Sequence, residues 1–357
     1  MKEKIKVVVI GAGNMGSSHA RAYHTLDGFE LVGLVDRIPD KRARLAAELG
    51  GIREFSTLDE ALHVTQPQAV AVCTYPDTHK AFALKSLQAG THVFVEKPLA
   101  ETVEDAEEII RVSQNMRKKV VVGYILRQHP AWIRFIEIAR SLGKPLVMRM
   151  NLNQQSTGKE WETHKGLLNS MSPIVDCGVH YVDVMCQMTR SKPIQVQAIG
   201  ARLSDEIKPD MFNYGQLQVI FEDKSVGWYE AGWGPMMSET AFFVKDVVGP
   251  MGCVSIVDPS AHGKAASSDI SAHTKTSQLL VHSSKRNQYG DFSEEDKLID
   301  TSDEPDHQEL CNREQAYLLK AIQEDLDLTE HLKDAINSLR VVLAADESAK
   351  TGQIVKL

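Results

Sequence analysis

The alternation of strand-like and helix-like segments in the first third of the chain limits its fold more than any other feature. Residues 5–10, IKVVVI, form a continuous apolar run rich in β-branched residues, which is typical of a strand buried on both faces. Periodicity and turn residues predict further strands at 29–36, 69–74, 92–96 and 118–124, and helices at 13–26, 40–49, 79–90 and 102–117. Alternation of this kind predicts a parallel sheet with helices on both faces.

After Tyr124 the pattern changes. Strand-like segments follow one another at 145–153, 194–202, 214–222, 225–231, 240–249 and 252–258, with helices expected at 130–142, 173–188, 308–324 and 329–349. Residues 259–277 and the acidic stretch 291–306 are predicted to be surface loops. We therefore predict an α/β protein with two domains. Residues 1–123 form a doubly wound parallel sheet, and residues 124–357 form an α+β domain with a large, mostly antiparallel open sheet.

Composition excludes several classes of protein. The formal net charge is −8 and no basic cluster occurs, which argues against nucleic-acid binding. Five scattered cysteines without a C-x-x-C pair predict neither a disulfide framework nor a metal site. The apolar stretch before Gly11 is too short for a secretion signal, and no run is long enough to cross a membrane. We expect a cytoplasmic, soluble protein that acts on small molecules.

A glycine-rich turn connects the first strand to the first helix. Gly11, Gly13 and Gly16 form G-x-G-x-x-G, with Asn14 and Met15 inside the motif. In this position the first glycine permits a tight turn, the second lets a pyrophosphate approach the backbone, and the third allows close packing of helix and strand. A structural turn without a ligand is the alternative, but the flanking strand and helix favour dinucleotide binding.

The second predicted strand ends in an acid. Asp36 follows Gly16 by twenty residues, where a carboxylate binds the adenosine ribose hydroxyls and repels a 2′-phosphate. The neighbouring Arg37 could instead bind such a phosphate. We expect NAD as the cofactor and keep NADP as a possibility.

Polar residues stand at the ends of two further strands. Thr74, Tyr75 and Pro76 follow one of them, and Glu96 and Lys97 end the other. In doubly wound sheets, ligands bind outside the carboxyl ends of the strands. A lysine there can stabilise a developing alkoxide.

The segment DCGVH, residues 176–180, places an acid and a histidine four residues apart. If Pro173 begins a helix, Asp176 and His180 project from one face. Such a pair suits general acid–base chemistry near neutral pH. Other interpretations of these residues are a pair on a helix surface, a buried structural histidine or half of a metal site.

Together these motifs resemble the Gfo/Idh/MocA family, named after glucose–fructose oxidoreductase, inositol dehydrogenase and rhizopine catabolism proteins. Members join an N-terminal Rossmann domain to an α/β domain with an open sheet. The shared motifs stand here as GAGNMG (11–16), EKP (96–98) and DCGVH (176–180). TYPDTH (74–79), which ends in His79, also matches, as do Tyr124, Arg127 and the closing SLRVVLAADESAKTGQIVKL.

The resemblance implies roles for four residues. His180 is expected to take a proton from a substrate hydroxyl, and Lys97 to act as its electrostatic partner, or as a competing base in some relatives. Asp176 would hold substrate hydroxyls, and Glu96 would touch the nicotinamide-side ribose. The Lys97–Pro98 bond, like that of many relatives, is expected to be cis.

Further candidates are weaker. They are Tyr124 and Arg127, Asn153, Trp161 and His164 after the first strand of the second sheet, and Trp233. Many relatives have a glycine-rich stretch before D-x-G-x-H, whereas this chain has LLNSMSP (167–173), so the substrate cannot be transferred from any relative.

The resemblance favours an NAD-dependent dehydrogenase of a sugar or cyclic polyol, forming homodimers or homotetramers through its large sheet. Two alternatives remain. One is a redox-neutral enzyme that uses NAD transiently to break a glycosidic bond. The other is a sensor that binds dinucleotide and sugar without turnover, because a fold does not fix a function.

Overall fold

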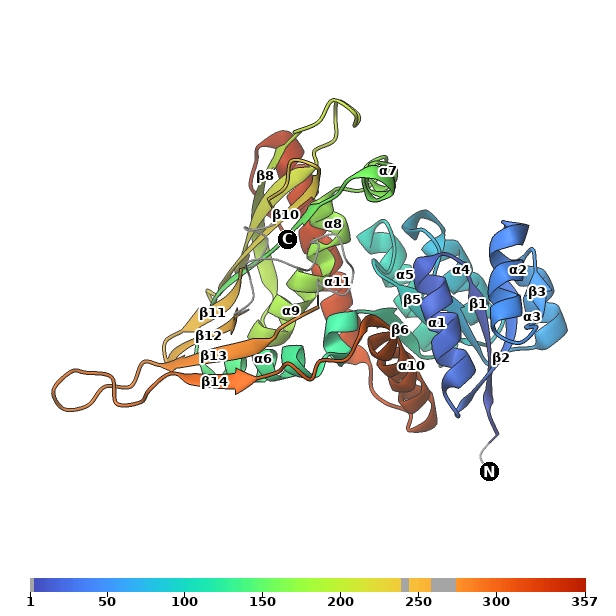
Figure 1. The fold of residues 1–357 in the computed structure, drawn as a ribbon, viewed down its shortest axis with the longest axis horizontal. Helices are drawn as coiled ribbons and strands as arrows, with labels where there is room; N and C mark the ends of the chain where they lie inside the picture. The colour runs from blue at the N-terminus through green and yellow to red at the C-terminus, as the bar shows by residue number, and fades with distance from the viewer. Residues whose placement is uncertain (1–2, 239–243, 258–273) are drawn as a thin grey trace. The chain divides into compact units, whose positions relative to one another are not determined.

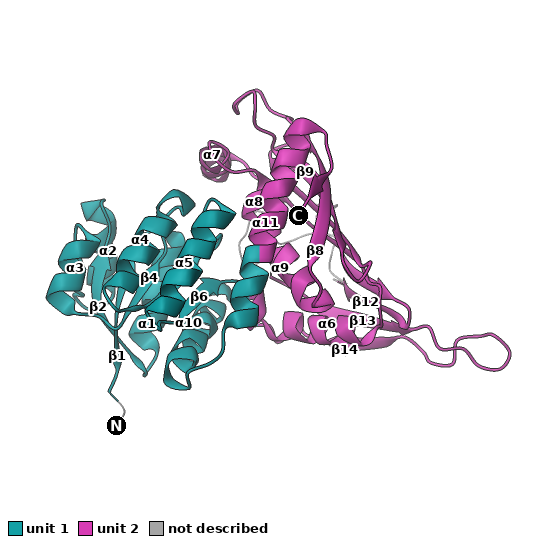
Figure 2. Cartoon of the chain, turned by 180° about the vertical axis from the view of Figure 1, so that it is seen from behind, with its two compact units in different colours: residues 1–125, 305–336 teal, residues 126–304, 337–357 magenta. Residues whose placement is uncertain are grey.

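The computed structural model describes residues 3–238, 244–257 and 274–357. Figure 2 shows its two units, of which unit 1 comprises residues 1–125 and 305–336, and unit 2 comprises residues 126–304 and 337–357. Each unit has its own sheet (Figure 1).

Unit 1 contains a six-stranded sheet in the order β3-β2-β1-β4-β5-β6, and every pairing in it is parallel. The strands are β1 Ile5–Ile10, β2 Phe29–Val35, β3 Glu54–Phe55, β4 Ala69–Val72, β5 His92–Glu96 and β6 Val120–Gly123. The predicted parallel sheet is therefore confirmed, with the two-residue β3 added at its edge.

The helices of unit 1 are α1 Asn14–Thr25, α2 Pro39–Glu48, α3 Leu58–Thr65, α4 Pro76–Gln88, α5 Val103–Asn115 and α10 His307–Gln323. Because crossover connections between parallel strands are right-handed, α1 and α2 lie on one face of the sheet and α3 to α5 on the other. The expected local signals are present. Thr102 caps α5 by accepting from the Asp105 N–H, and Gly90 after α4 has a φ of +82°.

Unit 2 contains a nine-stranded sheet in the order β14-β13-β12-β11-β7-β10-β9-β8-β15, in which only the β7–β10 pairing is parallel. Its strands are β7 Val147–Gln155, β8 Pro193–Ala201, β9 Tyr214–Phe221, β10 Val226–Gly234, β11 Lys245–Gly249, β12 Gly252–Val257, β13 Gln278–Ser283, β14 Lys297–Asp300 and β15 Val355–Lys356. This confirms the predicted mostly antiparallel sheet.

One face of this sheet is covered by helices. The helical elements after β6 are η1 Ile125–Gln128, α6 Pro130–Ser141, α7 Gly158–Leu167, α8 Pro173–Asp176, α9 Gly178–Thr189 and α11 Thr329–Thr351. Alternate residues such as Leu217, Val219 and Phe221 on β9 are fully buried, and Tyr229 on β10 meets Gly178 of α9. The predicted helix at 173–188 is thus two helices, α8 and α9, joined at Cys177.

Two features differ from the expectations. Residues 305–336 group with unit 1 rather than with the sheet domain, because α10 packs on α1 and Leu319 lies against Gly28. The acidic stretch 291–306 contains the edge strand β14. Most of the predicted loop 259–277 lies outside the described residues. Among the helices described, none is long and apolar enough to cross a membrane.

Candidate functional site

The glycine-rich turn brings β1, α1 and β4 into close contact. Gly11 has a φ of +98°, and a side chain on it would overlap the carbonyl oxygen of Cys73. A side chain on Gly16 would overlap the carbonyl of Gly11. A Cβ on Gly13, by contrast, would meet no protein atom within 4 Å. Close packing therefore explains Gly11 and Gly16, whereas the space at Gly13 is open to a ligand.

The first turn of α1 can receive an anion. No side chain caps this helix end and no acid lies in its first turn, where Asn14 and Met15 present their backbone. Helices α3, α5 and α10 are instead capped by Thr57, Thr102 and Asp306. An uncapped helix start with a positive dipole end is suited to a phosphate group.

Asp36 stands at the end of β2 beside the glycine-rich turn. Its two carboxylate oxygens accept from the backbone N–H groups of Ala12 (2.7 Å) and Ile38 (2.8 Å). These bonds orient the carboxylate and leave lone pairs for further donors, such as ribose hydroxyls. The adjacent Arg37 is exposed. The residues present thus fit a dinucleotide, with an acid at the position that favours NAD.

The carboxyl ends of β4 and β5 lie side by side in the sheet. They carry Thr74, Tyr75 and Pro76 on one side and Glu96 and Lys97 on the other. The side chain of Tyr75 is 67% exposed and Lys97 is half-buried. The Lys97–Pro98 bond is cis, as expected, and Lys144–Pro145 is cis as well.

His79 links these two strand ends. It is fully buried, and its ring nitrogens lie 2.8 Å from the carbonyl oxygen of Pro98 and 3.0 Å from that of Thr74. This geometry favours a role in holding the two loops together over the predicted contact with a cofactor.

In unit 2, Asp176 and His180 stand out from their surroundings. Every other residue from Met171 to Thr189 is buried, and these two are half-buried. Asp176 ends α8 and His180 lies in the first turn of α9, so the two are on different helices and are the most accessible residues of this segment. Ser172 starts this segment by capping α8 and by donating to Asp346 (2.5 Å).

Trp233 forms a polar and aromatic cluster near this segment. Its ring stacks on His164 at 4.7 Å, and its Nε1–H donates to Gln154 (2.7 Å), whose Oε1 also lies 3.6 Å from the Cys177 thiol. Burial lowers the pKa of His164 to about 4, so the ring is neutral at neutral pH. Gln154 was not predicted from the sequence, although strand alternation places it on the helix-covered face.

Three other candidates have partners elsewhere. Asn153 lies on the opposite face of the sheet from Gln154 and donates to Glu230. Trp161 donates to Glu206 (3.2 Å). Tyr124 belongs to unit 1, where its ring lies 6.4 Å from that of His331. Asn153 and Trp161 therefore hydrogen-bond to acids of unit 2 and not to Trp233.

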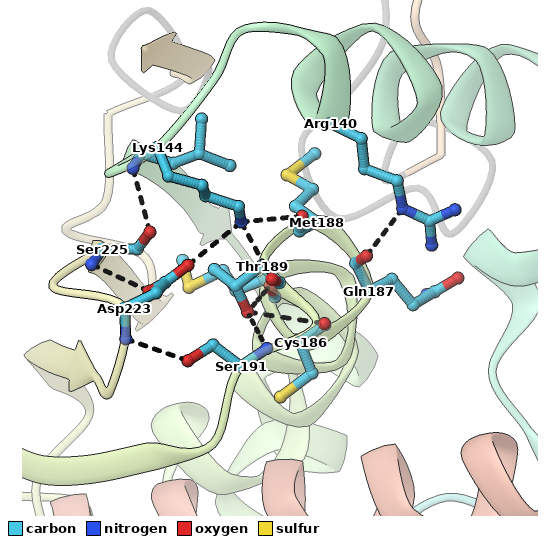
Figure 3. A network of polar contacts seen from close by, with 11 residues as sticks. Arg140, Lys144, Cys186, Gln187, Met188, Thr189, Ser191, Asp223 and Ser225 are labelled. Atoms are coloured by element: carbon cyan, nitrogen blue, oxygen red, sulfur yellow. Dashed lines mark hydrogen bonds and ion pairs between the residues drawn. The ribbon is translucent and has the colours of Figure 1, made fainter. Parts of the chain in front are cut away.

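The α9 helix is fixed at its middle and at its C-terminal end. Arg127 forms two hydrogen bonds of 2.6 and 2.8 Å with Asp183, one turn after His180, and this pair is nearly buried. At the C-terminal end, Figure 3 shows the Lys144 ammonium donating to the carbonyls of Met188 and Thr189. Arg140 donates to that of Gln187. Cations at this end satisfy free carbonyls and favour the helix dipole.

Lys245 is an unexpected buried cation behind α9. Its Nζ donates to the carbonyl of Asn151 (3.1 Å) and lies 5.6 Å from the centre of the Tyr181 ring. Burial lowers its pKa to about 7. Because the charged form is disfavoured in the folded state, stability is lost as the pH falls from the unfolded pKa, near 10.5, to about 7.

We expect Lys245→Met to raise the free energy of unfolding by a few kcal/mol at about pH 6 and by less at about pH 9. Chemical denaturation at several pH values measures this difference. Lys192→Met, at an exposed position, is the control and should show no such pH dependence. An equal effect of Lys245→Met at both pH values would show that its charge is not suppressed by the fold.

Comparison with known proteins agrees with this architecture. Residues 5–124 match the model of an oxidoreductase family with an NAD-binding Rossmann fold, and residues 138–243 match the GFO/IDH/MocA C-terminal domain. Together the two models cover more than half of the chain.

Curated relatives match part of the chain. UDP-N-acetylglucosamine 3-dehydrogenase of Acidithiobacillus ferrooxidans is 31% identical over 57% of this chain and 60% of its own length. Inositol 2-dehydrogenase of Klebsiella pneumoniae is 28% identical over 51% and 53%, respectively. The chain thus spans little more than half the length of these relatives. Scyllo-inositol dehydrogenase from Lactobacillus casei, solved with NAD(H) and scyllo-inositol, has a TM-score of 0.77 over 99% of both chains. Its 20% identity shows a shared fold.

Proposed function

We propose that this chain, which belongs to the GFO/IDH/MocA family of oxidoreductases, transfers a hydride between NAD and a hydroxyl-bearing carbon of a sugar or cyclic polyol. The observation that carries the proposal is the unfilled space at Gly13, beside an uncapped helix start and an oriented Asp36. The named activities of the curated relatives supply the substrate class.

In this proposal, separate residues bind the cofactor, move the proton and stabilise the developing charge. The amides at the start of α1 bind the pyrophosphate, and Asp36 binds the adenosine ribose. NAD, when bound, supplies the acceptor for the hydride. His180 takes the proton from the substrate hydroxyl as the C–H bond breaks and the carbonyl forms. Lys97 stabilises the negative charge that develops on the oxygen, and Asp176 accepts hydrogen bonds from neighbouring hydroxyls.

The experiment that tests this proposal is a substrate panel. Purified protein is mixed with NAD and with inositols, aldoses, sugar acids, nucleotide sugars and simple glycosides, and nicotinamide reduction is followed by absorbance. Reduction with one class supports the proposal. Sugar release from a glycoside without accumulation of NADH would replace it with redox-neutral bond cleavage. NAD binding without any turnover would point to a sensor.

We also propose that the open face of the unit 2 sheet binds a second copy of the chain. Val226 and Ile220 lie opposite each other on β10 and β9 and are 38% and 36% exposed, and Ile199 on β8 is 58% exposed. Neighbouring exposed apolar side chains on a sheet indicate an interaction surface. The opposite face of the unit 2 sheet is covered by helices.

We expect the protein to be a dimer or tetramer and the double variant Val226→Lys, Ile220→Lys to be a monomer, because the two charges would be buried without partners. Light scattering after size exclusion gives the mass. Met116→Lys, at an exposed position on unit 1, is the control and should keep the wild-type mass. A monomeric wild type would rule the interface out.

We propose the cytoplasm as the location, because the five cysteines are scattered along the sequence without the regular spacing of a disulfide framework.

A further inference from the structure

Unit 1 contains a buried chain of hydrogen bonds that joins α10, α1 and the end of β5. Tyr23 donates to Oε1 of Gln315. Nε2 of Gln315 lies 2.8 Å from Nδ1 of His19, and Nε2 of His19 lies 2.6 Å from Oε1 of Glu96. The side chains of Tyr23, His19 and Gln315 are fully buried, and Glu96 is 6% exposed.

The order of donors fixes the form of His19. Because the amide oxygen of Gln315 accepts from Tyr23, its NH₂ group faces His19, whose Nδ1 must then accept. The proton of the neutral ring is consequently on Nε2 and is donated to Glu96. The second oxygen of Glu96 accepts from the backbone N–H of Lys97 (3.2 Å). His19 thus connects the phosphate-binding helix with the strand end that carries Glu96 and Lys97.

A second carboxyl group lies close to this chain. Glu314 on α10 is 3% exposed, and neither of its oxygens has a hydrogen-bond partner. Burial, and then the Glu96 carboxylate, raise the pKa of Glu314 well above its usual value, which favours its protonated form. The titratable groups around Glu96 are Lys97 on its own strand end, His19, His79, Cys73, Cys311 and Glu314.

Glu96 and Glu314 interact electrostatically, and His19 gives Glu96 a hydrogen-bond donor that Glu314 lacks. We propose that His19 is a positioning residue that, held by Gln315 and Tyr23, keeps the Glu96 side chain oriented for the cofactor. The part concerning the cofactor rests on the proposed function and on the role that the family resemblance implies for Glu96, contact with the nicotinamide-side ribose. The raised pKa of Glu314 favours its neutral form, which limits its repulsion of the Glu96 carboxylate.

A metal ion is the competing interpretation of the same cluster. One ligand atom each from His19, Cys311 and Glu314 lie within 4.8 Å of one another, a spacing that a zinc ion can bridge. However, both ring nitrogens of His19 already have partners, so a metal would have to displace Gln315 or Glu96. Burial also raises the pKa of the Cys311 thiol, which disfavours the thiolate that zinc requires.

The binding test uses NAD itself. We expect His19→Leu to weaken NAD binding by about 10- to 100-fold, as misplaced contacts do, and His19→Gln, which can still donate to Glu96, to restore most of it. His24→Leu, at an exposed position on the same helix, is the matched control and should bind like the wild type. Isothermal titration gives the affinities, and the unfolding temperature shows whether each variant is folded.

A double-mutant cycle decides whether His19 acts through Glu96. If it does, adding His19→Leu to Glu96→Leu costs little further affinity. Full additivity of the two losses would overturn the proposal. Glu314→Gln should leave NAD affinity within about twofold, because the amide resembles the protonated acid. A tenfold loss in this variant would mean that Glu314 acts as an anion.

Two measurements test the cluster without the cofactor. NMR of protein labelled with ¹⁵N-histidine should show His19 with its proton on Nε2, and the opposite tautomer or a doubly protonated ring would contradict the proposal.

Metal analysis after incubation with Zn²⁺ and removal of the excess should find no bound zinc in this cluster. One equivalent of zinc, lost in Glu314→Gln, would establish the metal site instead. Failure of the wild type to bind NAD, with the histidine signal as expected, would reject the proposed function and the role for the cofactor, but not the hydrogen-bond chain.

Discussion

Lys97→Met is expected to lower kcat by about 10²- to 10³-fold with the substrate that the panel identifies, because a cation near a developing alkoxide stabilises mainly the transition state. The backbone at this position is held by the bond from the Lys97 N–H to Glu96, so loss of the ammonium should not move the loop. NAD affinity should therefore stay within severalfold of the wild type. Steady-state kinetics and direct titration separate the two effects.

His180→Ala is the companion change, with an expected loss of about 10²- to 10⁴-fold in kcat for the removal of a general base. It should also remove the acidic limb of the pH profile, because below the pKa of a histidine base the rate falls. The Arg127–Asp183 pair continues to fix α9 in this variant, so the fold should survive.

The controls are Lys41→Met and His63→Leu, at exposed positions of α2 and α3. Both should keep the wild-type kcat. If the acidic limb disappears in Lys97→Met but persists in His180→Ala, the two residues have exchanged roles. Should both variants keep more than about a tenth of the wild-type kcat, neither role can be right.

The parallel sheet could be predicted because its strands are buried on both faces and read as unbroken β-branched runs, such as IKVVVI in β1. The strands on the edge of the second sheet give no such signal. β14, KLID, is largely exposed and lies in an acidic segment whose composition predicts a loop. Propensity alone does not show that such a segment pairs with β13.

The motif residues could be located from the sequence. The side chains that contact them in the structure could be predicted only in part. Alternation along β7 puts Asn153 and Gln154 on opposite faces, and only Gln154 reaches Trp233. The sequence does not show which of the two faces the helices cover. The return of residues 305–336 to unit 1 is also a long-range effect, and it creates the cluster of Gln315 and Glu314 with His19.

Gly13→Ala is expected to weaken cofactor binding strongly while leaving the fold intact. The N-cap position of α1 has extended backbone, with φ −79° and ψ −167°, which alanine adopts without strain. A Cβ would meet no protein atom within 4 Å. The same Cβ would stand where the pyrophosphate must approach the backbone. Loss of one or two hydrogen bonds to a charged group then lowers NAD affinity by about 100-fold or more.

Alanine substitutions at two other glycines are the comparisons for Gly13→Ala. Gly166→Ala in α7 also adds a methyl group into open space and should leave NAD binding unchanged. Gly11→Ala should lower the unfolding temperature, because its positive φ and the Cys73 carbonyl both oppose a side chain. Titration with NAD and thermal unfolding of the three variants separate the effects. Tight NAD binding by Gly13→Ala at wild-type stability would show that the turn is only structural, and the dinucleotide proposal would lose the observation that carries it.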